Sequence, residues 1–431
     1  MTSTNKYVYR VGPGDGVRRH WAGGQTTVSG GRHARQGFYY YAFKGWPITP
    51  LAPSFSAELT SDIALAESEL QRLNNSPPGT QLLEAVARQL LRAEAVASSR
   101  IEGLILSHKK LAEAAFDPED TTVNARTVLG NVRAMEEAIR LATSRHRVTV
   151  EDIRAIHRRL FEGSQEVRAG TVRTSQSWIG TGENPWGARF IPVPEEDVAA
   201  LLEDLCAFLE RDDLPAVVQA ALAHAQFETI HPFEDGNGRV GRALIHLVLR
   251  RRGAAPHYVP PISLVLASNY AAYESGLTTF RERRYEDWAG VFARAVTIAC
   301  LGAEELAGRI QQLKNTWHES AKSPRQGSAA DRLIDALPVH PVVDLRSVQD
   351  ILRTSDEAAR LGIERLEAAG VLQEITKRKR GRAWECVGLF ALLDQFERKL
   401  AENDSGGQQR AAPRPTKRSA ERDATRARGA P

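Results

Sequence analysis

A stretch of twelve residues, HPFEDGNGRVGR from His231 to Arg242, contains residues whose types and spacing could do chemistry. Its glycines let backbone amides turn toward a ligand without a Cβ in the way. Successive amides form an anion-binding nest, and the helix that we expect from about Gly238 adds its positive end. The stretch therefore predicts an anion site beside a base.

The charged side chains of the same stretch indicate a polyphosphate. Asp235 can hold a divalent cation, because Mg²⁺ bound to phosphates usually takes one or two protein carboxylates. Arg239 and Arg242 lie three residues apart, so they share a helical face and can bind phosphate oxygens. His231, at the start of the loop, can take a proton from an incoming hydroxyl group. A glycine-rich turn with a buried histidine and exposed arginines is the alternative interpretation.

The order and spacing match the signature of the Fic family at every fixed position: histidine-proline-phenylalanine-x-aspartate-glycine-asparagine-glycine-arginine-x-x-arginine. On this stretch the chain is identified as a member of that family, and Phe233 is expected to pack the loop onto the core. Proteins that resemble it transfer AMP from ATP to a Tyr, Ser or Thr hydroxyl of a target protein. The family's phosphotransferases carry asparagine for the aspartate and lysine for the second glycine. Asp235 and Gly238 therefore favour AMP transfer here.

The resemblance implies a role for each residue of the stretch. His231 is the expected general base, Asp235 the expected Mg²⁺ ligand, and Asn237 the residue expected to orient the α-phosphate. Arg239 would contact the β-phosphate of ATP and Arg242 the γ-phosphate. The other expected nucleotide contacts are Gly236, Gly238, Val240 and Gly241.

An upstream stretch, SSRIEG, matches the family's inhibitory pattern, Ser/Thr-x-x-x-Glu-Gly/Asn, through Ser98, Glu102 and Gly103. In similar proteins this glutamate bonds the second arginine of the signature, which is Arg242 here. A carboxylate there removes the partner of the γ-phosphate and adds negative charge, so that ATP binds with a misdirected α-phosphate. The alternative is an ordinary salt bridge of a glutamate at the end of a helix.

Two further segments resemble parts of the family's active site. Residues 171–194, TVRTSQSWIGTGENPWGARFIPVP, predict a β-hairpin flap with a long turn, along which a target segment would lie by strand pairing. A purely structural hairpin is equally compatible with these residues. Tyr273 is the expected adenine-stacking residue, although Glu274 stands where the family often has a second aromatic. The expected flap contacts are Ser177, Trp178, Ile179 and Gly180.

The elements that position these residues are expected to be helices. Leu90, Ala97 and Ile101 recur at helical spacing ahead of a helix stop at Gly103. The predicted fold class is all-α: a Fic helical core with a β-hairpin flap, followed by a winged helix-turn-helix domain. The expected parts are a disordered tail (1–35), a Fic amino-terminal region with the inhibitory helix (36–115), a Fic catalytic core (116–320), a winged-helix domain (326–395) and a disordered basic tail (396–431).

The carboxyl-terminal part has the order helix, helix, helix, basic wing, which is typical of winged helices. The basic run KRKRGR, Lys377 to Arg382, could contact DNA phosphates. The candidate recognition helix, SDEAARLGIERLEAAG, carries four acids against two arginines, which disfavours a DNA major groove. We therefore expect at most weak DNA binding, with protein binding or a homodimer as alternatives. A transcription regulator that uses the Fic body as a nucleotide sensor, and an enzyme that removes AMP, are the rival functions.

Composition sets the remaining limits. A chain of 431 residues predicts two or three domains. No apolar run approaches the roughly 20 residues of a membrane helix, and the first residues lack a secretion signal, so we expect no membrane partner. Three scattered cysteines disfavour disulfides and cysteine zinc sites and predict a reducing cytoplasm. The residues after Gln408 include seven basic and two acidic side chains. The net positive charge of this tail exceeds the +4 of the whole chain, so the remaining residues are about neutral.

Overall fold

The computed structural model describes residues 14–22, 37–75, 80–119, 121–144, 146–164, 167–180, 184–375 and 381–408 of the chain. Helices dominate these residues, as the all-α class predicts. Across the described ranges no helix combines the length and the apolar character that crossing a membrane requires. Cys206, Cys300 and Cys386 are buried and form no disulfide.

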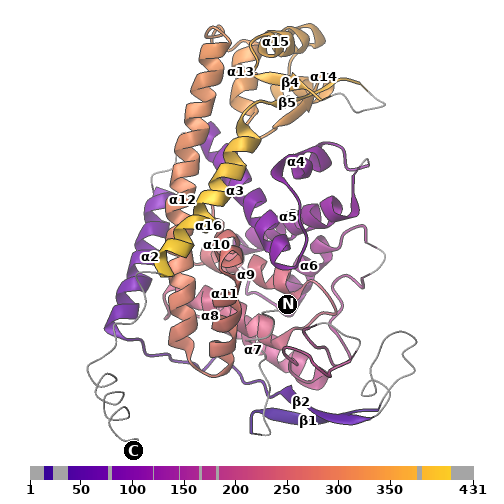
Figure 1. The fold of residues 1–431 in the computed structure, drawn as a ribbon, viewed down its shortest axis with the longest axis vertical. Helices are drawn as coiled ribbons and strands as arrows, with labels where there is room; N and C mark the ends of the chain where they lie inside the picture. The colour runs from indigo at the N-terminus through magenta and orange to yellow at the C-terminus, as the bar shows by residue number, and fades with distance from the viewer. Residues whose placement is uncertain are drawn as a thin grey trace, which may run out of the picture.

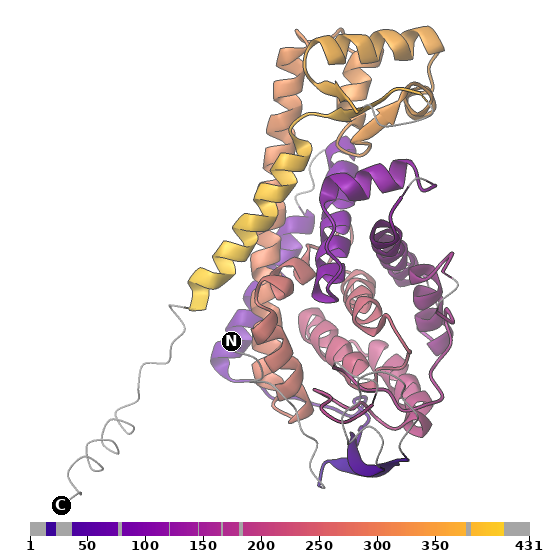
Figure 2. The same ribbon diagram turned by 45° about the vertical axis from the view of Figure 1, so that its right-hand side comes forward.

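A bundle of helices makes up the body of the molecule (Figures 1 and 2). The long helix α12 (Tyr285–Ser320) extends from the body to the carboxyl-terminal part and packs along α2 (Ala57–Asn75). The other helices of the body are α3 (Thr80–Ile101), α4 (His108–Phe116), α5 (Val123–Ala142), α6 (Val150–Leu160), α7 (Val198–Leu209), α8 (Ala216–Ile230), α9 (Asn237–Arg251), α10 (Ile262–Ser268) and α11 (Tyr270–Arg281), with a short 3₁₀ helix η1 (Glu195–Asp197) before α7.

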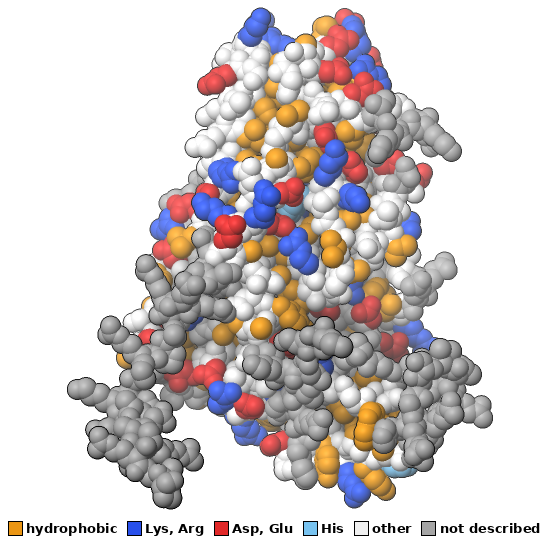
Figure 3. All heavy atoms as spheres, viewed as in Figure 1, with side chains coloured by type: hydrophobic (Ala, Val, Ile, Leu, Met, Phe, Trp, Pro, Cys, Tyr) orange, Lys and Arg blue, Asp and Glu red, His pale blue; other side chains and the backbone are white. Residues whose placement is uncertain are grey.

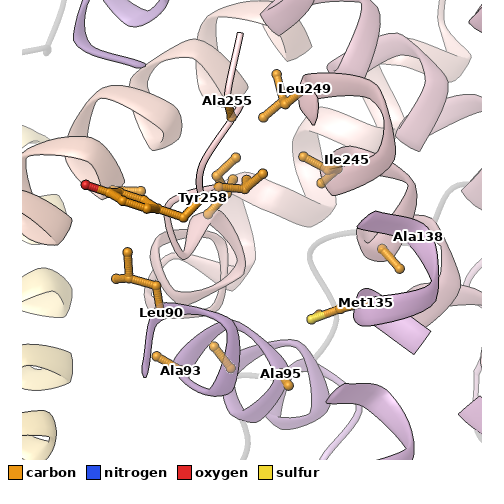
Figure 4. Close-up of a cluster of buried hydrophobic side chains, with 14 of the residues drawn as sticks. Leu90, Ala93, Ala95, Met135, Ala138, Ile245, Leu249, Ala255 and Tyr258 are labelled. Carbon is orange, nitrogen blue, oxygen red and sulfur yellow. The ribbon is translucent and has the colours of Figure 1, made fainter. Parts of the chain in front are cut away.

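Helices α8 and α9 lie at the centre of this bundle. Every residue of α8 is buried, and so is α9 from Asn237 to Leu249. A helix that is buried on all sides belongs in the core rather than at the surface. Figure 4 shows Leu90 of α3, Met135 of α5 and Ile245 of α9 directed into one apolar cluster. The loop that joins α8 to α9 is therefore held between two buried helices.

Helix α3 ends at the point that the sequence predicts. Val86, Leu90 and Ala97 are buried along one face, and Gly103 follows the helix in a left-handed conformation with φ of 82°. Glycine adopts this conformation without a Cβ penalty, which makes it a common helix stop. Ser98 and Glu102 consequently lie in the last turn of α3 and just beyond it.

The amino-terminal region differs from the prediction of a disordered segment over residues 1–35. Strand β1 (Gly16–Trp21) pairs antiparallel with β2 (Phe38–Phe43). Contacts with aromatic rings stabilise this pair of strands. The Arg18 guanidinium of β1 lies 3.8 Å from the ring centre of Tyr39 of β2, and Trp21 of β1 packs edge to face against Trp178 of the flap segment. The prediction is wrong for residues 16–21 because these long-range contacts outweigh the local composition. Residues 1–13 and 23–36 lie outside the described ones.

The predicted flap hairpin over residues 171–194 is also only partly present. One isolated bridge pairs Ile179 with Phe190, where a two-stranded ladder was expected. Side chains take the backbone acceptors instead, since Arg173 donates to the carbonyl oxygens of Ser175 and Val193. Pro192 and Pro194 have no N–H to donate to a ladder. The segment is therefore an ordered loop with a single bridge, and residues 181–183 are outside the description.

The carboxyl-terminal module, from α13 to β5, combines helices with a small antiparallel sheet whose strand order is β3-β5-β4. Leu333, Leu366 and Trp384 are buried in its core. Residues 376–380, most of the basic run Lys377–Arg382, lie outside the described part of the chain. Its elements are α13 (Ala329–Ala336), β3 (Val342–Asp344), α14 (Leu345–Leu352), α15 (Asp356–Ala368), β4 (Leu372–Glu374) and β5 (Ala383–Cys386).

Helix α16 (Leu389–Gln408) runs back from this module along α12 and α10 of the body (Figures 1 and 2). The expectation of disorder from residue 396 is therefore wrong as far as residue 408. Leu393, Phe396 and Leu400 follow helical spacing and are buried, and the burial of apolar side chains stabilises the helix. Leu400 lies so close to Gly302 that a Cβ there would be 2.6 Å from its methyl group. Residues 409–431 lie outside the description.

Candidate active site

The loop between α8 and α9 depends on two residues in the left-handed conformation. His231 has φ of 52° and ends α8, with its backbone N–H donated to the carbonyl oxygen of Phe227 at 2.9 Å. Gly236 has φ of 78° and precedes the first turn of α9. These two reversals direct the amino terminus of α9 toward the side chain of His231, as an anion site beside a base requires.

Asn237 closes this loop from within. Its side-chain oxygen accepts from the N–H of Phe233 at 2.9 Å, and its side-chain nitrogen donates to the carbonyl of the same residue at 2.8 Å. Phe233 is fully buried and stacks on His157, with 3.9 Å between ring centres. Phe233 therefore lies as the sequence analysis expects. The Asn237 side chain, expected to orient the α-phosphate, is instead engaged in the loop itself and shapes its backbone.

Asp235 and Arg239 form a pair at the edge of the site. The Asp235 side chain is 59% exposed, and its carboxylate lies 3.2 Å from the Arg239 guanidinium. Arg239 is itself buried beside the ring of Phe161, so its side chain diverges from that of Arg242. The two arginines thus contact separate partners, although the spacing predicts a shared face. Asp235 is the more accessible of the pair, and its carboxylate also accepts from the N–H of Gly236 at 2.6 Å.

The structure brings Arg242 together with both residues of the inhibitory pattern. Its guanidinium donates to the Ser98 hydroxyl at 2.8 Å, to the Ser98 carbonyl at 2.8 Å and to the Glu102 carboxylate at 2.7 Å. Burial, the largest single effect, lowers the pKa of Arg242, but the interactions with Glu102, Tyr273 and Glu228 together outweigh it and raise the pKa. Arg242 is therefore a permanent cation with its donors directed at α3.

Glu102 also lies against the first turn of α9. A Cβ built on Gly238 would overlap the Oε1 atom of Glu102. The carboxylate thus occupies the position where backbone amides at a helix amino terminus bind anions. Val240 and Gly241, two expected nucleotide contacts, lie on the buried side of α9: Val240 is fully buried, and a Cβ on Gly241 would meet Glu228.

These groups share one cavity of about 260 Å³. His231 reaches it from the loop, Glu102 from the end of α3, and Arg242 from α9. Its remaining lining includes the flap residues Ile179, Arg189 and Phe190 and the α11 residues Tyr270, Tyr273, Glu274, Leu277, Thr278 and Arg281. A base, an arginine and a helix amino terminus therefore face one enclosed space.

The imidazole of His231 is suited to accept a proton. Burial, and then the positive charges of Arg173 and Arg281, lower the pKa of His231 to about 3. The ring is therefore neutral at pH 7, which is the protonation state of a general base. Arg173 also holds the backbone here, because its Nε donates to the His231 carbonyl oxygen at 2.8 Å.

Tyr273 and the expected flap contacts take different positions from those predicted. Tyr273 is only 4% exposed, and its hydroxyl lies 2.9 Å from His224, so it is part of the wall and presents little ring surface to adenine. Tyr270, one helical turn earlier, lines the same cavity and is 38% exposed. Because Tyr270 stands three residues before Tyr273, helical spacing could have identified it from the sequence.

Of the four expected flap contacts, Ile179 alone lines the cavity. Trp178 packs against Trp21 of β1, and Gly180 has φ of 145°, while Ser177 offers its carbonyl to Gln176. Arg189, which the sequence analysis did not select, donates to Glu274 at 2.8 Å and joins the flap to α11. Both residues of that pair line the cavity.

Residues 147–249 match the model of the Fic/DOC family, and residues 60–140 match the model of its N-terminal region. The chain contains a Fic domain. Its catalytic signature and the inhibitory pattern fall in the two matched segments, respectively.

Curated relatives share this Fic domain over part of their length. Protein adenylyltransferase fic-1 of Caenorhabditis briggsae is 34% identical over 123 residues, 28% of this chain and 23% of the relative. Protein adenylyltransferase Fic of Drosophila ananassae is 25% identical over 238 residues, 51% of this chain and 46% of the relative. This chain therefore spans between about a quarter and a half of the length of these two relatives.

Solved structures with Fic domains resemble the model at a modest level. A crystal structure of a Fic family protein from Desulfovibrio desulfuricans G20 has a TM-score of 0.49 and 20% identity, covering 78% of this chain and 98% of that one. Fic-1 from C. elegans, residues 134–508, has a TM-score of 0.48 and 21% identity, covering 58% and 72%.

Proposed function

We propose that this protein is a protein adenylyltransferase, which transfers AMP from ATP to a hydroxyl group of a target protein. One observation carries the proposal: a neutral His231 faces the same cavity as Arg242 and the amino terminus of α9. A base beside a polyphosphate site is what this transfer requires. The names of the relatives, protein adenylyltransferases in Caenorhabditis and Drosophila, agree with it.

The geometry suggests how the residues divide the work. The triphosphate would lie on the first turn of α9, where Gly238 leaves room for it, and Arg242 would bind the γ-phosphate. Asp235, exposed at the rim, is the carboxylate that would hold Mg²⁺, which reduces the charge of the phosphates when bound. His231 would take the proton of a target Tyr, Ser or Thr hydroxyl. That oxygen then bonds to the α-phosphorus, and pyrophosphate leaves.

We infer that Glu102 inhibits this transfer. Its carboxylate bonds Arg242 at 2.7 Å and lies at Gly238, so it occupies both the arginine and the helix terminus that the γ-phosphate needs. Two anions cannot share that position without strong repulsion, because little water separates them. ATP would then bind only with its phosphates displaced, or after the carboxylate has moved.

Labelled ATP tests this function directly. The parent, Glu102→Gly and the double variant Glu102→Gly/His231→Ala are each incubated with Mg²⁺ and ATP labelled at the α-phosphate. We expect strong incorporation of label into protein only in Glu102→Gly. Label carried at the γ-phosphate is the control, since AMP transfer leaves it in pyrophosphate. Incorporation of the γ-label instead would indicate phosphate transfer and contradict the proposal.

We further infer that the carboxyl-terminal module is a winged helix whose described surface suits protein better than DNA. Its order of elements, with sheet order β3-β5-β4, is that of a winged helix. Arg360 of α15 bonds Glu364 at 2.7 Å, and Arg382 bonds Glu374 at 2.6 Å, so both cations are already paired. Basic and acidic side chains lie intermixed on the face seen in Figure 3, in contrast to a continuous basic surface.

A further inference from the structure

A buried carboxyl group, Glu228, lies one turn before His231 on α8 and lines the same cavity. Its Oε2 atom is 4.0 Å from Nδ1 of His231. The Oε1 atom of Glu228 and the Nδ1 atom of His231 are both buried without a hydrogen-bond partner among the described residues. Two polar atoms that water does not reach thus lie at the end of one helix, beside the reacting centre.

Such an arrangement is costly unless it serves the site. A buried polar atom that lacks a hydrogen-bond partner destabilises the folded protein, and more so where the atom is charged. The fold nevertheless makes room for this carboxyl, because a Cβ on Gly241 would lie 2.9 Å from Oε1 of Glu228. Burial also raises the pKa of Glu228 to about 7, so that its charge changes near neutral pH.

Charged and titratable groups face this carboxyl from each neighbouring element. His224 lies on α8 itself, and Arg242 on α9 favours the ionised form of the carboxyl. Arg281 on α11 also favours the ionised form, whereas Glu102 at the end of α3 opposes it. Tyr273 of α11 completes the surroundings. Release of Glu102 would therefore favour ionisation of Glu228.

We propose that Glu228 is a positioning residue for His231, whose carboxylate accepts the N–H of Nδ1 and so leaves Nε2 to take the proton of the target hydroxyl. The two atoms need to approach by about 1 Å, and catalytic hydrogen bonds are often long until substrate is bound. After the transfer of the proton, the imidazolium lies beside a carboxylate that stabilises it. This inference rests on the proposed transfer of AMP.

The main chain offers a competing partner. The carbonyl oxygen of Glu228 also faces the imidazole of His231 and raises its pKa, although burial lowers it more. One N–H therefore has two acceptors within reach, the main-chain oxygen and the side-chain carboxylate. Glu228→Gln separates them, because it keeps the main chain and the size of the side chain but removes the negative charge.

The first measurement is the rate of AMP transfer against pH in the Glu102→Gly protein. We expect its kcat to rise with pH as Glu228 ionises, at a pH below the value of about 7 that holds while Glu102 is present. Adding Glu228→Gln should abolish this rise and lower kcat by about 10- to 100-fold, less than the roughly 10²–10⁴-fold contribution of a whole general base. The KM for ATP should change little. Glu228→Asp keeps the charge, so it should retain the rise with pH.

The second measurement does not need transfer to occur. Nitrogen NMR of labelled histidine reports which ring nitrogen of His231 carries the proton, with His231→Ala assigning the signal. We expect Nδ1–H in the folded protein and a mixture of tautomers in Glu228→Gln, with thermal unfolding checking that each variant is folded. An inactive Glu102→Gly would overturn the proposed function, whereas the tautomer still decides the role of Glu228. An unchanged tautomer and an unchanged pH profile in Glu228→Gln would overturn the inference alone.

Discussion

At the scale of single residues, the site depends on one guanidinium that can serve only one anion at a time. Arg242 is buried, and its donors are bonded to Ser98 and Glu102. A γ-phosphate can bind it only when the carboxylate has left. In the proposed function, the activity would therefore depend on competition between the Glu102 carboxylate and the γ-phosphate for the same cation.

We predict that Glu102→Gly raises AMP transfer through Arg242. A charge-assisted hydrogen bond contributes roughly 1.5–3 kcal/mol. Because Glu102 is 37% exposed, we expect the lower end of that range and a gain of roughly 10-fold in productive ATP binding. The double variant Glu102→Gly/Arg242→Ala should return toward the activity of the parent. Label incorporation measures all three proteins, and a folded Glu102→Gly that binds Mg²⁺-ATP without transferring would contradict the prediction.

The sequence predicted which residues form the site better than it predicted how their side chains are oriented. The signature and the inhibitory pattern brought Arg242 and Glu102 together without any knowledge of the fold. It did not show that the Asn237 side chain bonds within its own loop, which depends on the conformation of that loop, or that Tyr273 is buried, which depends on neighbours distant in sequence such as His224. The i, i+3 spacing of Glu228 and His231 predicts that they lie next to each other. The sequence does not predict that the Oε1 atom of Glu228 lacks a hydrogen-bond partner among the described residues.

At the scale of elements, α16 bonds residues on both sides of Glu102, which follows α3 directly. Glu397 of α16 bonds Arg100 at 2.6 Å and His108 at 2.8 Å. These two partners lie on either side of Glu102 in the chain. Gln89 of α3 also donates to the carbonyl of Pro338 at 2.6 Å. The carboxyl-terminal part thus fixes α3 near both its middle and its end.

We predict that Glu397→Ala destabilises the protein and raises the basal transfer of AMP, because both attachments next to Glu102 are lost together. Truncating one partner of a charged hydrogen bond that is largely buried costs about 1–3 kcal/mol. Lys399→Ala is the matched control on the same helix: its exposed pair with Glu305 should contribute at most about 1 kcal/mol. Thermal unfolding and label incorporation measure the two effects, and equal losses in both variants would argue against the attachment.

The helices could be predicted from sequence because their apolar periodicity is local, as in α3. The flap could not, since the side chain of Arg173, inside the predicted hairpin itself, takes the carbonyl oxygen of Val193 that a ladder would use. In α16 the spacing of Leu393, Phe396 and Leu400 was present in the sequence. The charged, proline-rich residues that follow α16 obscured this helical spacing. In addition, the surface of α12 on which α16 packs belongs to another part of the chain.

At the scale of the whole molecule, buried titrating groups make stability depend on pH. Burial lowers the pKa of His224 and of His231 to about 3, so the unfolded chain binds these protons first and the folded state loses stability as the pH falls from about 6.5. Glu228, with its pKa raised to about 7, acts in the opposite direction as the pH falls from 7 toward 4.5. Burial also lowers the pKa of His157, to about 4, so three imidazoles oppose this one carboxyl and acidification should destabilise the protein.

We therefore predict that the thermal midpoint falls between about pH 6.5 and pH 5, the range in which unfolded histidines gain protons. His224→Gln removes one of the imidazoles whose pKa is lowered and should make the decline shallower. Thermal unfolding at constant ionic strength measures both proteins. A midpoint that rises on acidification would show that the carboxyl outweighs the imidazoles.

The pairing of surface charges also determines how strongly the protein binds nucleic acid. Since Arg360 and Arg382 are paired with carboxylates, we predict only weak DNA binding, without marked sequence preference and with a steep loss as salt rises. Fluorescence anisotropy with duplexes of different sequence at two salt concentrations measures this. A chain that ends at Gln408 is the control for the basic tail. A tight, sequence-selective complex that survives raised salt would favour the regulator.

The packing of α16 against the body affects how the molecule unfolds. Although α16 follows the carboxyl-terminal module in the chain, Leu393 and Leu400 are buried on the body, and Gly302 of α12 accommodates Leu400. Neither part can open fully without uncovering apolar surface of the other. Unfolding should therefore be cooperative across the boundary near residue 320, with one calorimetric peak and hydrogen exchange that protects both parts to a similar degree.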